Sequence, residues 1–138
     1  MSKPYIICIV DDDEIYKFTM EKMIESTGLA TKLIFFSDGE EAINFMIDNV
    51  ANSIDLPDLI FLDINMPIMD GFQFMEEYVK LKPIVKKKIT IYMATSSVDS
   101  ADIERFQKIS EISDYIVKPV KCEELKSIIE FWDKQESL

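Results

Sequence analysis

Short apolar runs alternate with amphipathic segments along this chain. The runs are continuously apolar, which is typical of strands in a sheet that is covered on both faces. Segments of helical periodicity separate these runs, and that order favours a parallel sheet with connecting helices. The sequence therefore predicts an α/β protein whose five strands cover residues Tyr5–Val10, Leu33–Phe36, Leu59–Leu62, Ile89–Ala94 and Tyr115–Val117.

Helices are predicted where apolar residues recur three and four positions apart. Four such stripes are present: Tyr16, Met20, Met23 and Ile24; Ile43, Met46, Ile47 and Val50; Phe72, Met75 and Val79; Leu125, Ile128, Ile129 and Trp132. A weaker fifth helix covers Asp99–Ile109, with Asp99 as its N-cap. Because crossovers between parallel strands are right-handed, we predict a doubly wound (βα)5 fold with strand order 2-1-3-4-5, a flavodoxin-like three-layer sandwich.

The composition narrows the class of function. The 138 residues suit one domain, and 48% of them are hydrophobic, which is enough for a core. A net charge of −11 argues against binding to DNA phosphates or to an anionic membrane. The absence of His excludes an imidazole base and a His-ligated zinc site. Two isolated cysteines, Cys8 and Cys122, fit a reducing compartment, and Lys86–Lys88 is interpreted as a solvated loop.

Polar residues follow four of the predicted strands. The first strand ends in Asp11-Asp12-Asp13, the third in Asp63, the fourth in Thr95-Ser96 and the fifth in Lys118-Pro119. In the predicted order these four strands are neighbours, and ligands bind outside the carboxyl ends of the strands in such sheets. We therefore expect three carboxylates, a hydroxyl and an ammonium group to share one patch of the sheet edge.

This set of groups suits phosphoryl chemistry. Crowded carboxylates raise each other's pKa, and a bound divalent cation relieves the repulsion. Oxygen ligands without His or Cys favour a hard ion, Mg²⁺ or Ca²⁺, and Mg²⁺ leaves room for phosphate oxygens. Lys118 can pair with one phosphoryl oxygen, and Thr95 can donate a hydrogen bond to another. Asp63 can act as a nucleophile toward phosphorus, which would give an aspartyl phosphate.

Each of these residues also has an ordinary structural interpretation. An Asp after a strand often caps the next helix, which we favour for Asp13, while for Asp11 and Asp12 taken alone the two interpretations are about even. Taken singly, the other polar strand ends are more often turn, loop or surface residues. Their conjunction at four neighbouring strand ends is what favours the chemical interpretation.

Four segments together resemble the receiver domain of two-component response regulators: Ile9–Asp12, Pro57–Gly71, Tyr92–Ser97 and Asp114–Pro119. The segment Asp63–Gly71 is the most specific of them. The resemblance implies a single receiver domain over residues 1–138, with a core of about 5–133 and no output domain, similar to stand-alone regulators of the chemotaxis type. We also expect a cytoplasmic location, in line with the two isolated cysteines.

By this resemblance, Asp63 is the phosphoacceptor, and the donor is a phosphohistidine on a sensor histidine kinase or a histidine phosphotransfer protein. One Mg²⁺, for which Mn²⁺ or Ca²⁺ can substitute, is bound at Asp11, Asp12, Asp63 and the backbone carbonyl of Asn65, with Asp12 as a direct ligand and Asp11 holding a metal-bound water. Lys118 pairs with the phosphoryl group, and the Lys118–Pro119 peptide bond is expected to be cis.

The resemblance also implies how the signal leaves the site. Thr95 is the switch hydroxyl, and the ring of Tyr115 moves inward with it. The surface of the fourth helix, fifth strand and fifth helix then changes for a downstream protein target. The side chains of Asn65 and Ser97 flank the site and tune the lifetime of the phosphoryl group.

The chain is expected to assist its own phosphorylation and dephosphorylation without being an enzyme. It is also expected to bind neither DNA nor membranes, and to be a monomer or a weak dimer.

Three other functions are alternatives to that of a receiver domain, each from a different class of protein. A phosphohydrolase of the haloacid dehalogenase type also has a nucleophilic Asp after a strand, but its general acid two residues later is here Asn65, which transfers no proton. An EF-hand beginning at Asp63 is rejected, because Pro67 and Phe74 occupy ligand positions. A binding module that signals without phosphate is disfavoured, since all of the site residues are present.

Overall fold

The computed structural model describes residues 5–29, 31–96 and 99–137, without the side chains of residues 31 and 132–137. Its strands form one parallel sheet: β1 (Tyr5–Val10), β2 (Thr31–Phe36), β3 (Leu59–Asp63), β4 (Thr90–Thr95) and β5 (Ile112–Val117). The strand order is β2-β1-β3-β4-β5, which confirms the predicted topology. The doubly wound fold is the outcome expected of right-handed crossovers between parallel strands.

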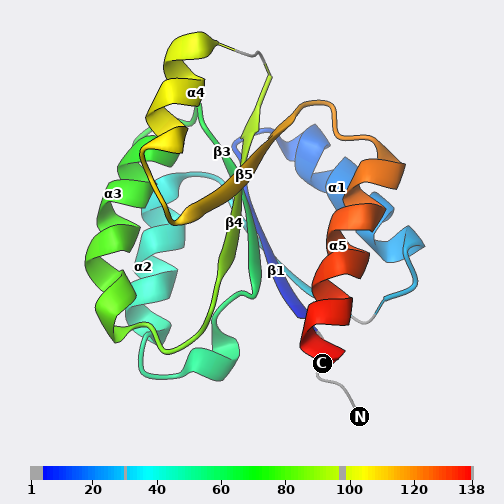
Figure 1. Ribbon diagram of the computed structural model, residues 1–138, viewed down its shortest axis with the longest axis horizontal. Coiled ribbons are helices and arrows are strands. Elements are labelled where there is room, and N and C mark those ends of the chain that lie inside the picture. Colours follow the sequence, from blue (N-terminus) through cyan, green and yellow to red (C-terminus); the bar gives the residue numbers. More distant parts are fainter. Residues whose placement is uncertain (1–4, 30, 97–98, 138) are drawn as a thin grey trace.

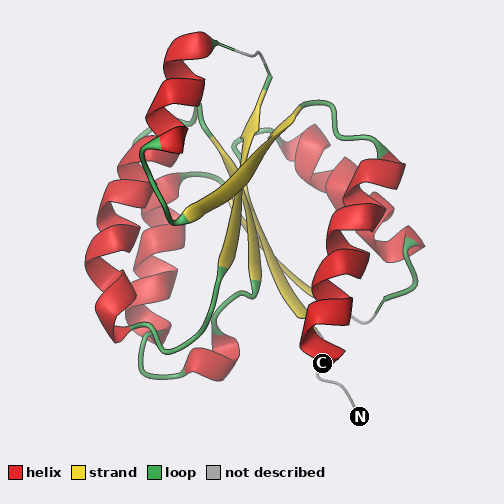
Figure 2. Ribbon diagram, viewed as in Figure 1, coloured by secondary structure: helices red, strands yellow, loops and turns green. Residues whose placement is uncertain are grey.

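Helices cover both faces of the sheet, as Figures 1 and 2 show. They are α1 (Glu14–Ser26), α2 (Gly39–Asn49), α3 (Gly71–Leu81), α4 (Ser100–Gln107) and α5 (Cys122–Ser137), with short 3₁₀ turns at Ser53–Asp55 and Lys82–Ile84. In Figure 1, α1 and α5 lie on one side of the sheet, and α2, α3 and α4 lie on the other. None of the helices in the described part of the chain is both long and apolar enough to cross a membrane.

The core consists of two clusters, one on each side of the sheet. Cys8 and Val10 of β1 belong to the cluster under α2 and α3, while Ile7 and Ile9 belong to the cluster under α1 and α5. All residues of β1 and β3 are therefore buried, which explains why these strands are continuously apolar in the sequence.

Aspartate side chains fix the beginnings of four helices. Asp13, Asp38, Asp70 and Asp99 occupy the N-caps of α1, α2, α3 and α4 and accept hydrogen bonds from backbone N–H groups of the first turn. Each carboxylate satisfies donors that the helix leaves unpaired and meets the positive end of the helix dipole. The capping interpretation of Asp13 is thus confirmed, and so is the prediction of Asp99 as a cap.

Several local predictions are wrong. β5 begins at Ile112 rather than Tyr115, because this edge strand carries exposed polar residues that break its apolar run. Ile47 and Val79 belong to the apolar stripes that predict α2 and α3, but they face solvent, with 49% and 41% of their surface exposed. Lys87 is not a solvated loop residue: its Nζ lies 3.1 Å from Asp58 Oδ1. The predicted packing of Trp132 falls on a side chain outside the described residues.

Candidate functional site

The carboxyl ends of the central strands bring the predicted site residues to one edge of the sheet. Asp63 is the last residue of β3, and its register partner on β4 is Ala94. Thr95 comes directly after Ala94, and its register partner on β5 is Val117, directly before Lys118. Asp11 and Asp12 follow β1, which is the other neighbour of β3. The four strand ends therefore lie side by side, as the sequence predicted.

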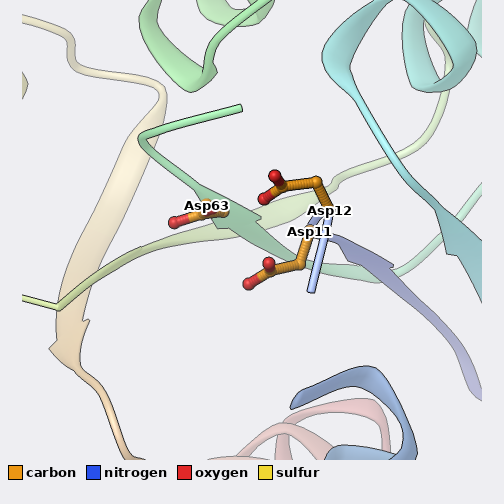
Figure 3. Close-up of side chains that lie close together, drawn as sticks. All are labelled: Asp11, Asp12 and Asp63. Atoms are coloured by element: carbon orange, nitrogen blue, oxygen red, sulfur yellow. The ribbon is translucent and has the colours of Figure 1, made fainter. Parts of the chain in front are cut away.

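Three carboxylates converge at this edge (Figure 3). Asp11, Asp12 and Asp63 each offer an oxygen, and these oxygens all lie within 4.8 Å of one another. Asp11 and Asp63 are buried, whereas Asp12 is exposed, so the cluster opens to solvent on one side. An all-oxygen donor set of this charge and spacing fits a hard divalent cation such as Mg²⁺.

The turn after β1 holds Asp11 in place. The backbone N–H of Asp11 donates to the carbonyl of Phe36 at 3.0 Å, which ties the end of β1 to the end of β2. Its carboxylate Oδ1 accepts a hydrogen bond of 2.9 Å from the backbone N–H of Asp13. Asp13 in turn caps α1, so the same short turn orients the Asp11 carboxylate and starts the helix.

Lys118 is the cation of the site. Its Nζ pairs with Asp11 Oδ2 at 2.5 Å and with Asp63 Oδ1 at 3.2 Å. Burial acts to lower the pKa of Lys118, but the hydrogen bond and the charges of the two carboxylates outweigh it and leave that pKa raised. Lys118 therefore carries its charge at neutral pH. The Lys118–Pro119 peptide bond is cis.

The carboxyl group of Asp63 is a weaker acid than an ordinary aspartate. Burial and the charge of Asp11 raise its pKa to about 6, and the pairing with Lys118 and a backbone hydrogen bond from Asn65 only partly oppose this. A second positive charge beside Asp63 would favour the ionised form further. The electrostatics of the site thus favour binding of a cation at the three carboxylates.

The remaining predicted residues lie around this centre. Thr95 is buried at the end of β4, and its carbonyl accepts a 2.7 Å hydrogen bond from the backbone N–H of Lys118. Asn65 is exposed, two residues after Asp63. Tyr115 is half-buried on β5, and its ring meets that of Phe106 on α4 edge-on, with 4.8 Å between the centroids. Ser97 lies outside the described residues.

The loop after β3 is packed closely against the phosphoacceptor candidate. A Cβ on Gly71 would lie 2.4 Å from the carbonyl oxygen of Asp63, so only glycine fits here without moving the backbone. The N–H of Gly71 donates to the carbonyl of Ile64 at 2.9 Å. Ile68, within this loop, has a φ of 68° and is 72% exposed, although β-branched residues disfavour that conformation. The loop after Asp63 is therefore tightly constrained.

One residue near the site was missed by the sequence analysis. The sequence predicts Tyr16 only as part of a helical stripe, yet the Lys118 Nζ lies over its ring, 4.4 Å from the centroid. Its hydroxyl is buried and has no hydrogen-bond partner among the described residues. Burial and the charges of Asp11 and Asp63 raise the pKa of this hydroxyl. The signal in the sequence was its position one helical turn after Asp12.

The fold and the site together define a class: a doubly wound parallel sheet with an acidic cluster and a lysine at the carboxyl ends of its strands. Residues 7–130 match the family described as the response regulator receiver domain. The chain belongs to this family, whose members serve as phosphoacceptors in two-component signalling. The resemblance found in the sequence is therefore confirmed.

Similar curated proteins differ in length. A probable methanogenesis regulatory protein, FilR2 of Methanothrix harundinacea, is 23% identical over 92% of this chain and 80% of its own length. The sensor histidine kinase CheAY of Helicobacter pylori is 29% identical over 91% of this chain but only 14% of its own length. The chain thus spans most of the first relative and a small part of the second.

Solved structures share the fold over nearly the whole chain. A two-component response regulator from Cytophaga hutchinsonii has a TM-score of 0.82 and 24% identity, covering 94% of this chain and 97% of its own. A CheY-like response regulator receiver domain protein from Methanospirillum hungatei has a TM-score of 0.74 and 25% identity, covering 98% of both chains. These likenesses agree with the strand order and helix placement described above.

Proposed function

We propose that Asp63 is the residue of this chain that accepts a phosphoryl group. The observation that carries this proposal is the position of the Asp63 carboxylate at the end of β3, within ligand distance of two other carboxylates and 3.2 Å from the Lys118 ammonium. A buried nucleophile beside one fixed cation and a cation-binding cluster is suited to attack on phosphorus.

In the proposed step, a carboxylate oxygen of Asp63 attacks the phosphorus of a phosphohistidine. The new P–O bond forms as the P–N bond breaks, and the electron pair of that bond leaves with the donor imidazole. Lys118 pairs with a phosphoryl oxygen and offsets the charge that collects on it during transfer. The Thr95 hydroxyl donates a hydrogen bond to another phosphoryl oxygen once the group has arrived.

A Mg²⁺ ion is the proposed cofactor, held by Asp11, Asp12, Asp63 and the backbone carbonyl of Asn65, with Mn²⁺ or Ca²⁺ as substitutes. The fit rests on the oxygen-only donor set of three converging carboxylates; burial first, and then the negative charge of Asp11, raises the pKa of Asp63. When bound, such an ion supplies positive charge at the phosphoryl oxygens and orients them.

The proposed output is a change of surface at α4, β5 and α5. Thr95 and Tyr115 lie on the two strands at this side of the sheet, and Tyr115 contacts Phe106 of α4. Movement of Thr95 toward a phosphoryl group would free space into which the Tyr115 ring can turn, and α4 would then lose an aromatic contact. A downstream protein target would recognise the altered surface.

The proposed donor is a sensor histidine kinase or a histidine phosphotransfer protein, in the cytoplasm. The net charge of −11 supports a protein partner rather than DNA or an anionic membrane. The single-domain organisation and the monomeric or weakly dimeric state remain predictions. We also propose that the chain catalyses no reaction on other substrates beyond its own phosphorylation and dephosphorylation.

The test is phosphoryl uptake from acetyl phosphate with Mg²⁺, read by intact mass. We expect one added phosphoryl group on the unmodified protein, none on Asp63→Asn, and unchanged uptake in Asp48→Asn, which alters an exposed aspartate of α2. Uptake that persists in Asp63→Asn would overturn the assignment. Multiple turnover on phosphate monoesters would instead favour a hydrolase.

A further inference from the structure

Tyr16 contacts the ammonium group of Lys118, but none of the roles proposed above involves this tyrosine. Its ring lies in the first turn of α1, under the Lys118 ammonium at 4.4 Å from the centroid. A cation at this distance from an aromatic face is attracted by the negative charge of that face. The same ammonium pairs with Asp11 and Asp63, so the ring is its third contact.

We propose that Tyr16 is a positioning residue whose ring holds the Lys118 ammonium beside Asp63, where it can meet the incoming phosphoryl group. This proposal rests on the proposed phosphoacceptor function. Lys118 has a flexible four-carbon stem, and a contact that restricts the stem lowers the entropy cost of bringing its charge to the transition state.

The ring itself is held from two directions. It packs against the core cluster between the sheet and helices α1 and α5. Its backbone N–H donates to Asp13 Oδ1 at 3.1 Å, in the N-cap of α1. Because Asp13 also follows directly after the acidic pair, the start of α1 fixes Tyr16 in relation to Asp11 and Asp12. The ring is thus a rigid support for a flexible side chain.

The ring is also the contact of Lys118 that does not change during the reaction. Asp63 loses its free carboxylate when it is phosphorylated, and Asp11 shares its charge with any bound metal ion. A neutral aromatic face neither binds a hard cation strongly nor reacts with the donor. It can therefore hold the ammonium in the metal-free, metal-bound and phosphorylated forms alike.

The ring rather than the hydroxyl carries this role. The Tyr16 hydroxyl is buried without a hydrogen-bond partner among the described residues, and an unpaired buried hydroxyl destabilises the fold. Tyr16→Phe keeps the aromatic face and removes that hydroxyl, whereas Tyr16→Leu keeps an apolar side chain and removes the face. The two variants therefore separate positioning by the ring from simple filling of the core.

The experiment compares the wild type, Tyr16→Phe and Tyr16→Leu in two measurements. The first is the rate constant of phosphoryl uptake from acetyl phosphate with Mg²⁺, which we expect to fall about fivefold in Tyr16→Leu and to be retained in Tyr16→Phe. The second is the NMR shift of the Lys118 ε-methylene protons, which an aromatic face shields. We expect that shielding in the wild type and in Tyr16→Phe, and its loss in Tyr16→Leu.

Two controls make the result specific. Phe18→Leu alters an exposed ring of the same helix that lies under Lys22, at 5.4 Å, and should leave both measurements unchanged. In a Lys118→Ala background, Tyr16→Leu should add no further loss of uptake, because the two residues act as a unit. An additional loss in that background, or a Tyr16→Phe variant as slow as Tyr16→Leu, would overturn the proposal.

The outcomes also distinguish this proposal from the phosphoacceptor function. If the wild type takes up no phosphoryl group, the proposed function fails, whatever the Tyr16 variants do. If the wild type is phosphorylated and Tyr16→Leu matches its rate with the Lys118 proton shifts unchanged, only the positioning role fails. Unchanged far-ultraviolet circular dichroism of each variant would exclude loss of the fold as the cause of a slower rate.

Discussion

The Lys118 ammonium lies 3.2 Å from Oδ1 of Asp63 and also pairs with Asp11, so one cation faces two buried carboxylates. Asp12 adds a third carboxylate within ligand distance. Before any metal binds, the three carboxylates of the site outnumber its one ammonium group, and burial together with the charge of Asp11 raises the pKa of Asp63. The arrangement favours cation binding at the expense of the stability of the metal-free protein.

Asp63→Asn should stabilise the metal-free protein at neutral pH. The pKa of Asp63 is about 6 in the folded protein, above its ordinary value, so the folded state holds the proton more tightly than the unfolded state does. Stability is then lost as pH rises from about 4 to about 6, and the loss is complete above that range. We expect the variant to gain about 2 kcal/mol at neutral pH and almost nothing below about pH 4, measured by urea unfolding.

Mg²⁺ provides the control for this effect. Saturating Mg²⁺ should stabilise the wild type more than Asp63→Asn, because the variant lacks one of the proposed ligands, and the difference between the two proteins should shrink. A stability gain that is the same at every pH would mean that ionisation of Asp63 is not its cause.

Two neighbouring aspartates should separate metal binding from helix stability. Asp12 is exposed and contributes to the acidic cluster, whereas Asp13 caps α1. Asp12→Ala should weaken Mg²⁺ binding about tenfold or more with little change in unfolding free energy. Asp13→Ala should cost about 1 kcal/mol of stability and leave Mg²⁺ affinity within about twofold. Isothermal titration and urea unfolding of both variants test this, and equal effects of the two changes would contradict it.

The convergence of the site could be predicted because it follows from backbone topology. Continuous apolar runs identify buried strands, right-handed crossovers limit the strand order, and that order makes β1, β3, β4 and β5 contiguous. Asp63 and Thr95 end two of these strands and Lys118 directly follows a third, so the order of the strands brings all three to the same edge of the sheet. No knowledge of side-chain packing is needed for this step.

What could not be predicted depends on packing between distant segments. Tyr16 has the spacing of a core residue, and only the docking of α1 beside the loop after β5 brings its ring under Lys118. Lys87 appears in a run of lysines. Its ion pair with Asp58 joins the loop before β4 to the residue before β3, at the same edge of the sheet. Helical periodicity and charge runs carry no information about such partners.

Gly71→Ala should disturb the site through the backbone. The added Cβ would overlap the carbonyl oxygen of Asp63 at 2.4 Å and approach Ile64 Cα at 3.1 Å, and neither atom can move without shifting the end of β3. We expect a loss of about 2 kcal/mol or more in unfolding free energy and weaker Mg²⁺ binding. Gly28→Ala is the matched control: its φ is +73° but its surroundings are open, so it should cost about 1 kcal/mol without affecting Mg²⁺.

The two cysteines should differ sharply in reactivity. Cys8 is 2% exposed in the centre of β1, and its burial raises the pKa of the thiol, so the reactive thiolate is scarce at neutral pH. Cys122 is exposed at the start of α5. A disulfide reagent should therefore label one thiol in native buffer and both after unfolding. In Cys122→Ser, labelling should require unfolding, and its rate would report how often β1 leaves the sheet. Rapid native labelling of that variant would contradict the burial of β1, the strand that leads into the acidic pair.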